Sequence, residues 1–397
     1  MKKIRWGLMS ATMKHRTITF LLIGILVFLI SGCGSKSAVE SVASSEMTEI
    51  AANPGRDDTE EAYESEAEAA NDADGELKII TVGSDDARIK VGMVSGVGGI
   101  NDHSFNQSAW DGLQSLHEEM GARVSYIETT NTDEFYDGLC TLAEMGCDIC
   151  WGIGYNFADA VQEAAKAYPD THFAIVDYEY DEIPSNVTCA TFRAEESSFM
   201  VGYLAAAMSK TGKVGFIGGM EAEQISAFQY GYMEGARKAD LDYGKTTEVV
   251  TEYLGSFTDE KLGKDTAEKM YEDGCDIIFH ADGGAGTGVI EAAKNKNSYV
   301  IGVDGDQSYL APENVLTSAV KKVGVVLSNI PVQYDMGEKI GGIAIEYGVS
   351  ERAVGIPKDH PNIPDDLYEA VMKIEQDIIV NEIKVPENEQ EYLDFMK

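Results

Sequence analysis

The sequence predicts an α/β protein made of two similar, Rossmann-like lobes, each built on a mainly parallel sheet. Short apolar strands alternate with helical segments of roughly ten to fifteen residues, the pattern of βαβ units. Two landmarks also recur at similar offsets. The strand-and-turn patterns at Val91 and Val214 lie 123 residues apart, and the Gly-Cys-Asp units at Gly146 and Gly274 lie 128 apart. Finally, 397 residues, 44% of them hydrophobic, suffice for two domains with a core each.

The N-terminus has the features of a bacterial export signal that ends in a lipidation site. Basic residues precede an apolar run of about thirteen residues at 18–30, which is too short to span a bilayer but suits a signal-peptide core. The run ends in Ser31-Gly32-Cys33, and small residues before a cysteine resemble a lipobox. We expect residues 1–32 to be a lipoprotein signal peptide and Cys33 to carry a lipid that anchors the chain to the extracytoplasmic face of the cell membrane. A plain signal peptide or a single anchor helix is the alternative.

Residues 33–87 are expected to form an acidic, disordered tether. Between Gly34 and Ala87 the sequence has fifteen Asp or Glu against three Lys or Arg, and almost no aromatic residues. Such a segment cannot bury enough apolar surface to offset its ordering entropy, and charge repulsion extends it. An acidic interaction tail is the alternative. The apolar run at 77–82 has the pattern of a stray strand, but the polar residues at 84–86 separate it from the domain.

The charge and the cysteines exclude several classes of function. A formal charge of −37 argues against nucleic acid as a partner, because phosphate binding needs clustered Lys and Arg. Cys147 and Cys150 have the CxxC spacing of zinc and redox sites, but no second CxxC or histidine pair follows. We therefore expect no metal and no cofactor, and we interpret the cysteines of the folded part as buried thiols.

The first half of the folded part alternates strands and helices. Ser104 stands where an N-cap residue is expected before the first helix. The predicted strands lie at 89–94, 123–128, 149–152 and 173–176, and the predicted helices at 105–120, 133–145 and 157–168. Helices between consecutive strands predict parallel pairing.

The second half repeats this plan and ends in a tail too short for a third domain. Its expected elements are a strand and turn at 213–219, a helix at 223–239, a strand at 248–253, a helix at 259–273 and a strand that opens at 277. The tail predicts a strand at 315–320, a long helix at 323–347, a strand at 353–356 and a helix at 365–376. We expect the tail to return across the hinge and complete both lobes.

The residues that follow the predicted strands have the chemistry of a binding site. In open parallel α/β sheets, ligands bind beyond the carboxyl ends of the strands. The segments there are 98–107, 154–156, 177–178, 218–220, 255–257, 282–284 and 304–306, and they concentrate polar, glycine and aromatic residues. This mixture suits a neutral, planar ligand with many hydroxyls, because rings stack on it while carboxylates and amides bind the hydroxyls.

Several ordered motifs occur from Ile89 to the C-terminus. They are Asn101-Asp102-x-Ser104-Phe105-Asn106-Gln107, Gly255-Ser256-Phe257-x-Asp259, Ala281-x-Gly283-Gly284-x-Gly286, Ile301-Gly302-Val303-Asp304-x-Asp306-Gln307 and Leu316-Thr317-Ser318-x2-Lys321-Lys322. Together they resemble the basic membrane protein family, also called the purine nucleoside receptor A type, whose members deliver nucleosides to ABC importers. The resemblance implies two lobes joined by a three-strand hinge, the type I periplasmic-binding-protein fold.

The resemblance also implies a set of ligand-binding residues. Phe105 and Phe257, one from each lobe, would stack on the two faces of the base. The others are Asn106 and Asp177 from the first lobe, and Asp304, Lys321 and the backbone near Gly283 from the second, which would hold the ribose. The aromatic rings as core residues, the acids as caps or turn formers and Lys321 as a solvated surface charge are the alternatives. Family members commonly carry Asp where this chain has Gly96.

The predicted organisation follows from these observations. Residues 88–192 with 322–350 are expected to form the first lobe, and residues 193–321 with 351–397 the second. The expected function is that of a solute-binding lipoprotein that binds a nucleoside, with a purine as the implied base, between its lobes. Its expected partners are an ABC permease and ATPase and, through Cys33, the membrane. A binding protein or sensor for a sugar, nucleobase or signalling molecule on the same fold is the alternative.

Enzyme motifs are not matched. Gly284-x-Gly286-x-Gly288 with Asp304 beyond it has GxGxG spacing rather than the GxGxxG of a dinucleotide site. The six histidines form no HExxH, and there is no GxSxG elbow. We therefore expect a binding protein and no catalytic residue.

Overall fold

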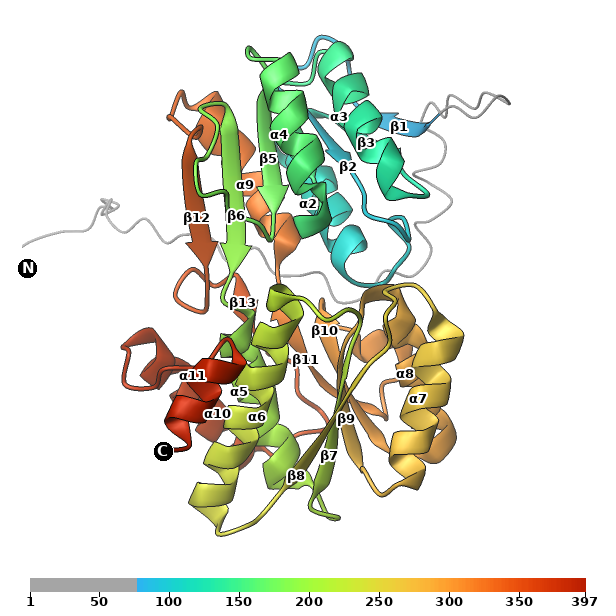
Figure 1. Ribbon diagram of the computed structural model, residues 1–397, viewed down its shortest axis with the longest axis vertical. Coiled ribbons are helices and arrows are strands. Elements are labelled where there is room, and N and C mark those ends of the chain that lie inside the picture. Colours follow the sequence, from blue (N-terminus) through green and yellow to red (C-terminus); the bar gives the residue numbers. More distant parts are fainter. Residues whose placement is uncertain (1–76) are drawn as a thin grey trace, which may run out of the picture. The chain divides into compact units, whose positions relative to one another are not determined.

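Two β-sheets organise the chain in the computed structural model, which describes residues 77–397 (Figure 1). The predicted signal peptide, the lipidation site Cys33 and most of the predicted tether lie outside the described residues. The described part of the chain belongs to one compact unit, so contacts between its two sheets can be followed residue by residue.

The first lobe is built on a seven-stranded sheet. Its strands are β1 (Lys78–Val82), β2 (Lys90–Val94), β3 (Arg123–Glu128), β4 (Ile149–Gly152), β5 (His172–Val176), β6 (Val187–Phe192) and β12 (Ile343–Tyr347). In space they follow the order β1-β3-β2-β4-β5-β6-β12, and every pair is parallel except β1 with β3. One face is covered by α2 (Phe105–Met120) and α9 (Val323–Asp335), and the other by α3 (Phe135–Glu144) and α4 (Ala158–Ala167).

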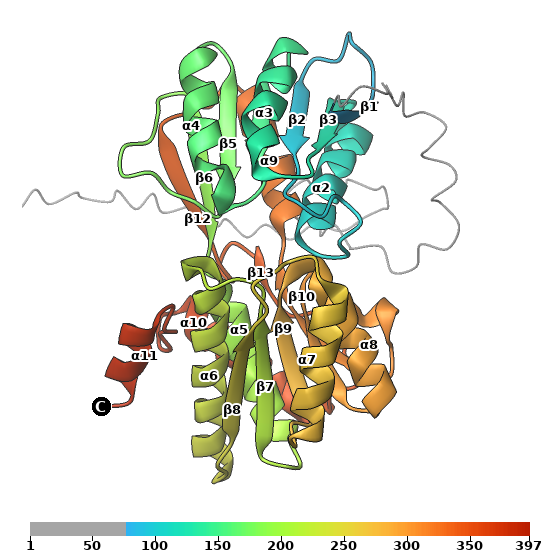
Figure 2. The same cartoon turned by 45° about the vertical axis from the view of Figure 1, so that its right-hand side comes forward.

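The second lobe is built on a six-stranded sheet. Its strands are β7 (Lys213–Gly218), β8 (Glu248–Tyr253), β9 (Ile277–Ala281), β10 (Tyr299–Asp304), β11 (Val315–Lys321) and β13 (Val354–Gly355). Helices α5 (Ala194–Met208), α6 (Glu223–Tyr243) and α10 (Asp365–Ile379) pack on one face. Helices α7 (Glu260–Glu272) and α8 (Gly286–Lys296) pack on the other (Figure 2). A short final helix, α11 (Glu389–Phe395), contacts α6.

The predicted repeat is visible in the strand order. The first sheet contains the run β3-β2-β4-β5-β6, and the second contains β8-β7-β9-β10-β11, which is the same arrangement in a second stretch of sequence. All the pairs within these two runs are parallel. The predicted α/β class with two Rossmann-like lobes is therefore confirmed, and β5 of the first lobe corresponds to β10 of the second.

Local sequence signals explain where the elements begin and end. The buried residues Ala109, Trp110, Leu113 and Leu116 recur at helical spacing and turn one face of α2 towards the sheet. The helix ends at Gly121, which adopts a left-handed φ of 66° that suits glycine. Helix α7 begins after Asp259, whose side chain accepts a hydrogen bond from the Leu262 N–H at 2.9 Å.

The predicted long helix at 323–347 is wrong. Helix α9 stops at Asp335, and Ile343–Tyr347 instead forms β12, which pairs in parallel with β6. Gly337 and Gly342 adopt φ values of 81° and 74° between the two elements, which breaks the helix. The first lobe thus receives its last strand from the C-terminal tail.

The predicted tether extends too far towards the domain. Residues 78–82 form the edge strand β1, which pairs antiparallel with β3 from Lys78↔Glu128 to Val82↔Val124. Four of its five residues are β-branched and Val82 is buried in the core, so the segment gains both ladder hydrogen bonds and apolar contacts. The polar residues at 84–86 form a turn between β1 and β2 rather than a domain boundary.

The cysteines of the described part are free thiols. Cys147, Cys150, Cys189 and Cys275 are buried, and Cys140 is half-buried. The interpretation of these residues as core thiols is confirmed for the four buried ones.

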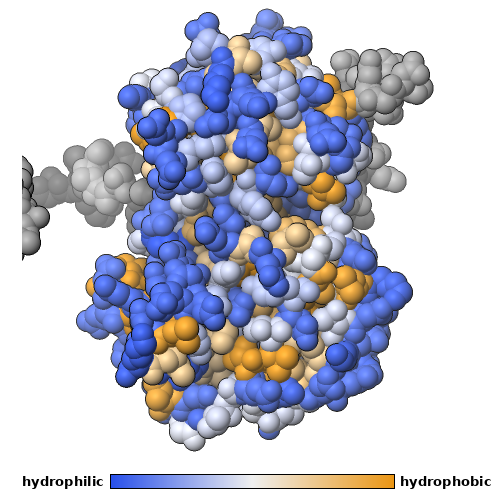
Figure 3. Space-filling view, viewed as in Figure 1, coloured by the Kyte–Doolittle hydropathy of each residue, from blue (hydrophilic) through white to orange (hydrophobic). Residues whose placement is uncertain are grey.

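The surface is mainly hydrophilic on the face that Figure 3 shows, where apolar residues form separate patches. This fits the formal charge of −37 of the full chain. None of the helices within residues 77–397 has the length and apolar character needed to cross a membrane.

Helices α5 and α6 pack so closely that three glycines are required between them. A Cβ on Gly202 would lie 2.1 Å from the backbone oxygen of Tyr232, and a Cβ on Gly235 would lie 2.0 Å from that of Phe199. Gly231 is similarly close to Glu195. No side chain fits at these positions, so the two helices are in backbone contact along their length.

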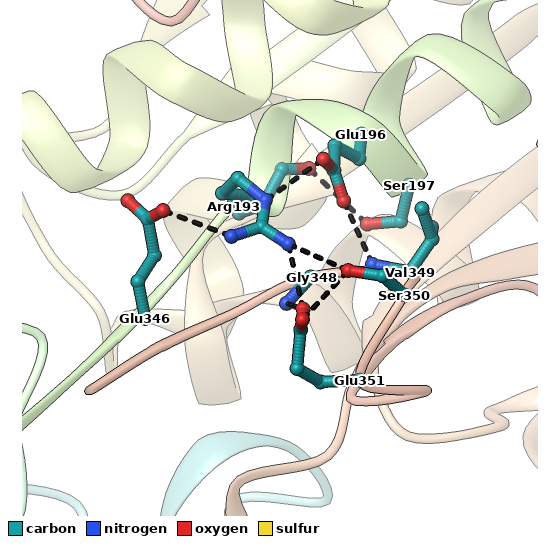
Figure 4. A network of polar contacts seen from close by, with 9 residues as sticks. Arg193, Glu196, Ser197, Glu346, Gly348, Val349, Ser350 and Glu351 are labelled. Carbon is teal, nitrogen blue, oxygen red and sulfur yellow. Dashed lines mark hydrogen bonds and ion pairs between the residues drawn. The ribbon is translucent and has the colours of Figure 1, made fainter. Parts of the chain in front are cut away.

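Three chain segments connect the lobes: β6 to α5, β11 to α9 and β12 to β13. Arg193 of the first segment binds carboxylates of the third, with Nη1 2.8 Å from Glu346 Oε2 and Nη2 2.6 Å from Glu351 Oε2 (Figure 4). Its Nε donates to Glu196, whose other oxygen accepts the Val349 N–H at 2.7 Å. Two of the three hinge segments are thus joined through one guanidinium.

Candidate functional site

The carboxyl ends of the two sheets face each other and are joined by hydrogen bonds. Ser104, before the first turn of α2, donates its hydroxyl to Asp304 Oδ2 at the end of β10. Gln307 Nε2 donates to the backbone oxygen of His103 at 3.0 Å. His103 Nδ1 also lies 3.0 Å from the hydroxyl of Tyr309. Loops that follow strands of both lobes therefore meet, as expected for a ligand site of this fold class.

Lys321 and Asp177 form a buried ion pair across the lobes. Lys321 is the last residue of β11, and Asp177 follows β5. The Lys321 Nζ lies 2.5 Å from Asp177 Oδ2, and the two side chains are 4% and 9% exposed. The backbone oxygen of Asp177 accepts a further bond from Gln224 Nε2 of α6 at 3.0 Å. The alternative that Lys321 is a solvated surface charge is therefore excluded.

Aromatic rings surround the Lys321 ammonium. Its Nζ lies 5.0 Å from the ring centroid of Phe105, 5.1 Å from that of Phe192 and 5.8 Å from that of Phe228. The rings come from the first lobe, the end of β6 and α6 of the second lobe. Their electron-rich faces attract a cation, which helps to compensate for the desolvation of the ammonium group.

Asp304 is a buried acid with an altered protonation equilibrium. Burial raises the pKa of its carboxyl to about 6, although Lys321 and the Ser104 hydroxyl act in the opposite direction. The negative charges of Asp102 and Asp177 add to the rise. Asp304 and Asp177 therefore lie close enough for the charge of Asp177 to affect the pKa of Asp304.

The backbone is strained at the same place. His103, Asp177 and Asp304 adopt φ values of 52°, 63° and 64°, in the left-handed region that few residues other than glycine occupy. Asp177 and Asp304 hold equivalent positions in the two sheets. Such strain persists only where the surrounding structure enforces it, and it is common at binding sites.

Asn106 lies in the first turn of α2 and is 6% exposed. Its side-chain oxygen accepts the Gly96 N–H at 3.0 Å, and its nitrogen donates to Asp102 Oδ2 at 2.9 Å. Asp102 and Ser104 therefore join the predicted site residues at the start of this helix.

Phe257 and Gly283 lie together at the end of the second sheet. The half-buried ring of Phe257 covers Gly219, where an added Cβ would lie 2.3 Å from ring atom Cδ1. Gly283 has a φ of 59°, and its Cβ would lie 3.2 Å from the Phe257 backbone oxygen. The next residue, Gly284, approaches Asp102 of the first lobe, because its Cβ would lie 3.5 Å from that of Asp102.

Phe105 and Phe257 each pack partly against the core of their own lobe. The aromatic contacts found within residues 77–397 do not include a pair between these two rings. Their stacking on the two faces of one base stays a prediction.

Five residues of this cluster are absent from the predicted set: Asp102, Ser104, Phe192, Gln224 and Phe228. Phe192 ends β6, a strand that the sequence pattern does not reveal. Gln224 and Phe228 are four residues apart on α6, which follows the turn at Gly218 and Gly219. The i,i+4 spacing after a glycine turn is the signal by which they could have been found.

The cluster is closed by its own contacts. As whole residues, Asp177, Asp304 and Lys321 are 8%, 6% and 3% exposed. Two surface hollows, of about 190 and 370 Å³, are lined by other residues, including His172 and Tyr334 in the first and Tyr243 and Leu367 in the second. Neither of these two hollows includes Asp177, Asp304 or Lys321.

Comparison with known proteins places this geometry in context. The profile of a family described as "ABC transporter substrate-binding protein PnrA-like" matches residues 89–389. Basic membrane protein A of Borreliella burgdorferi is 41% identical over 305 residues, which cover 76% of this chain and 88% of that protein. The ABC transporter nucleoside-binding protein BmpA of Lactococcus lactis is 36% identical over 319 residues, 75% of this chain and 89% of that one.

Among solved structures, an ABC transporter solute-binding protein from Aeropyrum pernix K1 superposes with a TM-score of 0.70 at 25% identity. The match covers 78% of this chain and 96% of the other. The likeness therefore extends over both lobes.

Proposed function

This chain belongs to the PnrA-like family of ABC transporter substrate-binding proteins, and on that premise we propose that it binds a nucleoside between its two lobes. The relative from Lactococcus lactis, named as nucleoside-binding, supports the class of ligand. The family is one of substrate-binding proteins and not of enzymes. The corresponding partners are an ABC permease and its ATPase.

One observation carries the proposal. Asp304 and Lys321 of the second lobe are held against Ser104, Phe105 and Asp177 of the first, in a cluster of charges and rings that is closed to solvent. A carboxylate can accept two hydroxyl donors and an ammonium can donate to the same diol, so the pair suits a ribose. The face of Phe105 suits a base, because every base has a π face.

The proposed mechanism is closure about the hinge. In an open form the Lys321–Asp177 and Ser104–Asp304 contacts are broken, and ligand hydroxyls replace the Ser104 hydroxyl on Asp304. Closure then desolvates the ligand and strengthens these polar interactions. A ligand shifts the equilibrium by its preference for the closed form, which the permease would recognise.

We expect the base to be a purine. Asn106 offers an amide with a donor and an acceptor, the combination that pairs with the N6 and N7 atoms of adenine. Gly96 supplies no carboxylate beside it. The chain therefore has an amide, rather than an acid, as its polar contact near the base.

We also propose that Cys33 carries a lipid that holds the protein on the extracytoplasmic face of the membrane. The predicted signal peptide and the acidic segment that follows support this. Labelling cells with a radioactive fatty acid should mark the wild-type protein and not Cys33→Ser. Equal labelling of both would overturn the anchor and leave the binding proposal intact.

Titration calorimetry of soluble protein beginning at Gly34 tests the ligand. The titrants are adenosine, inosine, guanosine, uridine, free adenine and ribose. We expect the purine nucleosides to bind with the highest affinity, because a nucleoside engages both the rings and Asp304, and a purine offers the rings a larger face than uridine does. Binding of ribose or adenine alone at higher affinity than any nucleoside would favour the sugar or nucleobase alternative and overturn the proposal.

A further inference from the structure

Asp102 collects four N–H donors at the start of α2. Its Oδ1 accepts from the backbone N–H groups of Ser104 and Gln107, both at 3.0 Å. Its Oδ2 accepts from the backbone N–H of Asn106 at 2.8 Å and from the Asn106 side-chain nitrogen at 2.9 Å. The residue is 8% exposed. Three of these bonds satisfy the N-terminal N–H groups of the helix, which have no partners inside it.

The fourth bond has a different consequence, because it selects one orientation of the Asn106 amide. The Gly96 N–H can only donate, and it meets the amide oxygen at 3.0 Å. The Asp102 carboxylate can only accept, and it meets the amide nitrogen. Turning the amide over would place its NH₂ against the Gly96 N–H and its oxygen against the carboxylate. Both interactions would be repulsive, so the amide has a single allowed orientation.

This orientation leaves a defined set of hydrogen-bonding groups for a ligand. An Asn side chain has two N–H donors and two oxygen lone pairs. Asp102 accepts one of the two N–H groups, and the Gly96 N–H donates to one of the two lone pairs. One N–H and one lone pair of Asn106 therefore remain for a ligand. At the N7/C6 edge of a purine, adenosine offers an acceptor beside a donor and fits them, whereas a 6-oxopurine offers two acceptors there and leaves the second lone pair of the Asn106 oxygen without a donor.

We propose that Asp102 is a specificity-determining positioning residue, which acts through Asn106 to favour 6-aminopurine over 6-oxopurine nucleosides. Asp102 does not itself touch the base, because both of its oxygens are engaged by the helix and by Asn106. The inference rests on the proposed nucleoside-binding function. It explains how the Asn106 amide distinguishes a hydrogen-bond donor from an acceptor at position 6 of the base.

Asp102→Asn is the direct test, because it replaces one acceptor oxygen by a donor NH₂ of the same shape. Asp276→Asn is a matched control. Asp276 also accepts two backbone N–H groups, those of Lys210 at 2.7 Å and Thr211 at 3.1 Å, together with the Ser209 hydroxyl at 2.7 Å. It precedes β9, at the amino ends of the strands and away from the cluster.

The measurement is the ratio of the adenosine and inosine affinities by calorimetry. We expect Asp102→Asn to reduce the preference for adenosine about tenfold, the scale of one buried hydrogen bond. Asp276→Asn should leave the ratio within about twofold of wild type. An Asp102→Asn protein that loses affinity for both nucleosides by one common factor would overturn the proposal, because a capping role alone predicts that result.

A double-mutant cycle separates action through Asn106 from general damage. In an Asn106→Ala background, Asp102→Asn should leave the ratio unchanged. If it still shifts the ratio, Asp102 acts by another route and the proposal fails. A wild-type protein that binds neither nucleoside would instead show that the proposed function is wrong.

One measurement needs no folded Asp102 variant. The side-chain amide resonances of Asn106, assigned by their loss in Asn106→Ala, should be protected from solvent exchange in the wild-type protein. Protection would support an amide held between Gly96 and Asp102. Exchange as fast as that of an exposed asparagine would overturn the proposal even if Asp102→Asn does not fold.

Discussion

Lys321 of the second lobe and Asp177 of the first form an ion pair that is almost completely removed from solvent, with Nζ 2.5 Å from Oδ2. The two residues stand at the carboxyl ends of β11 and β5, 144 positions apart in the chain. A pair of this kind is stable only while both partners are present, because either charge alone would be buried without compensation. The pair therefore links the chemistry of the cluster to the position of the lobes.

Removal of the Lys321 charge should have a large effect. In Lys321→Ala, Asp177 keeps its charge without a partner, so we expect the closed form to lose about 3 kcal/mol or more. Nucleoside affinity should fall, and small-angle scattering should report a larger radius of gyration. Lys296→Ala is the control. Lys296 pairs with Glu272 at 2.7 Å, and because the two side chains are 30% and 66% exposed, the pair should contribute at most about 1 kcal/mol. Equal effects of the two changes would contradict the assignment.

Binding should depend on pH through Asp304, whose pKa is raised to about 6 by burial. Ribose hydroxyls donate to the charged carboxylate, so binding favours the deprotonated form. Affinity for ribosides should be constant well above pH 6 and should decrease below it, approaching about tenfold per pH unit. Calorimetry between pH 5 and 7.5 measures the slope. Asp304→Asn should bind weakly without this slope, and a flat wild-type profile would exclude Asp304 from the site.

Phe257→Ala should weaken nucleoside binding by about 1–3 kcal/mol, the scale of stacking between a base and an aromatic ring. The binding free energy of free bases should fall by the same amount, because the stacking does not involve the ribose. Leu262→Ala, at a 38% exposed apolar residue of α7, is the control. An unchanged dissociation constant for Phe257→Ala would remove this ring from the proposed site.

The contribution of Glu195 to the stability of the protein should fall with rising pH. This residue is 6% exposed at the start of α5, and burial raises the pKa of its carboxyl from 4.5 to about 8. The folded state therefore holds a proton that the unfolded chain releases between these values, so the contribution of Glu195 to stability is largest below pH 4.5 and declines towards pH 8. Glu195→Gln should raise the free energy of unfolding at pH 7 by roughly 3 kcal/mol and have little effect at pH 4. Urea denaturation at both pH values checks this, and an equal gain at both would contradict it.

The network at Arg193 should stiffen the hinge. A Cβ on Gly348 would lie 2.1 Å from Arg193 Nη2, so Gly348→Ala should displace the guanidinium without removing any charge. We expect a loss of about 1–3 kcal/mol of stability and faster amide exchange at 346–351, since Glu196, Glu346 and Glu351 lose their common partner. Gly305→Ala, where an added Cβ meets nothing within 4 Å, is the control for stability. Unchanged exchange in Gly348→Ala would show that the network does not restrain the hinge.

Local signals predicted much of the fold. Helix α2 has its predicted bounds because apolar spacing and a terminal glycine agree, and β3, β4 and β8 also match. The pattern did not reveal α5, because thirteen of its fifteen residues are buried and no polar face marks its period. Strand β12 was assigned to a helix, since its pairing with β6 depends on residues about 150 positions away.

The site was predictable only in part. Position after a strand, together with the family resemblance, selected Asp177, Asp304 and Lys321, and the structure brings these three together. The contacts of Ser104 with Asp304 and of Phe228 with Lys321 depend on how the lobes face each other, which no local pattern encodes. The stacking roles of Phe105 and Phe257 and the backbone role of Gly283 stay predictions.

The glycine-mediated contact between α5 and α6 has a mechanical consequence. Because Gly202, Gly231 and Gly235 leave no space between the two backbones, α5 and α6 should move as one rigid body. Helix α5 begins next to Arg193 at the hinge. Helix α6 carries Gln224, which donates to the backbone oxygen of Asp177, and Phe228, whose ring lies beside the Lys321 ammonium. A small rotation at the hinge should therefore move both helices together, so that the bond from Gln224 to Asp177 of the opposite lobe forms or breaks in one step with that rotation.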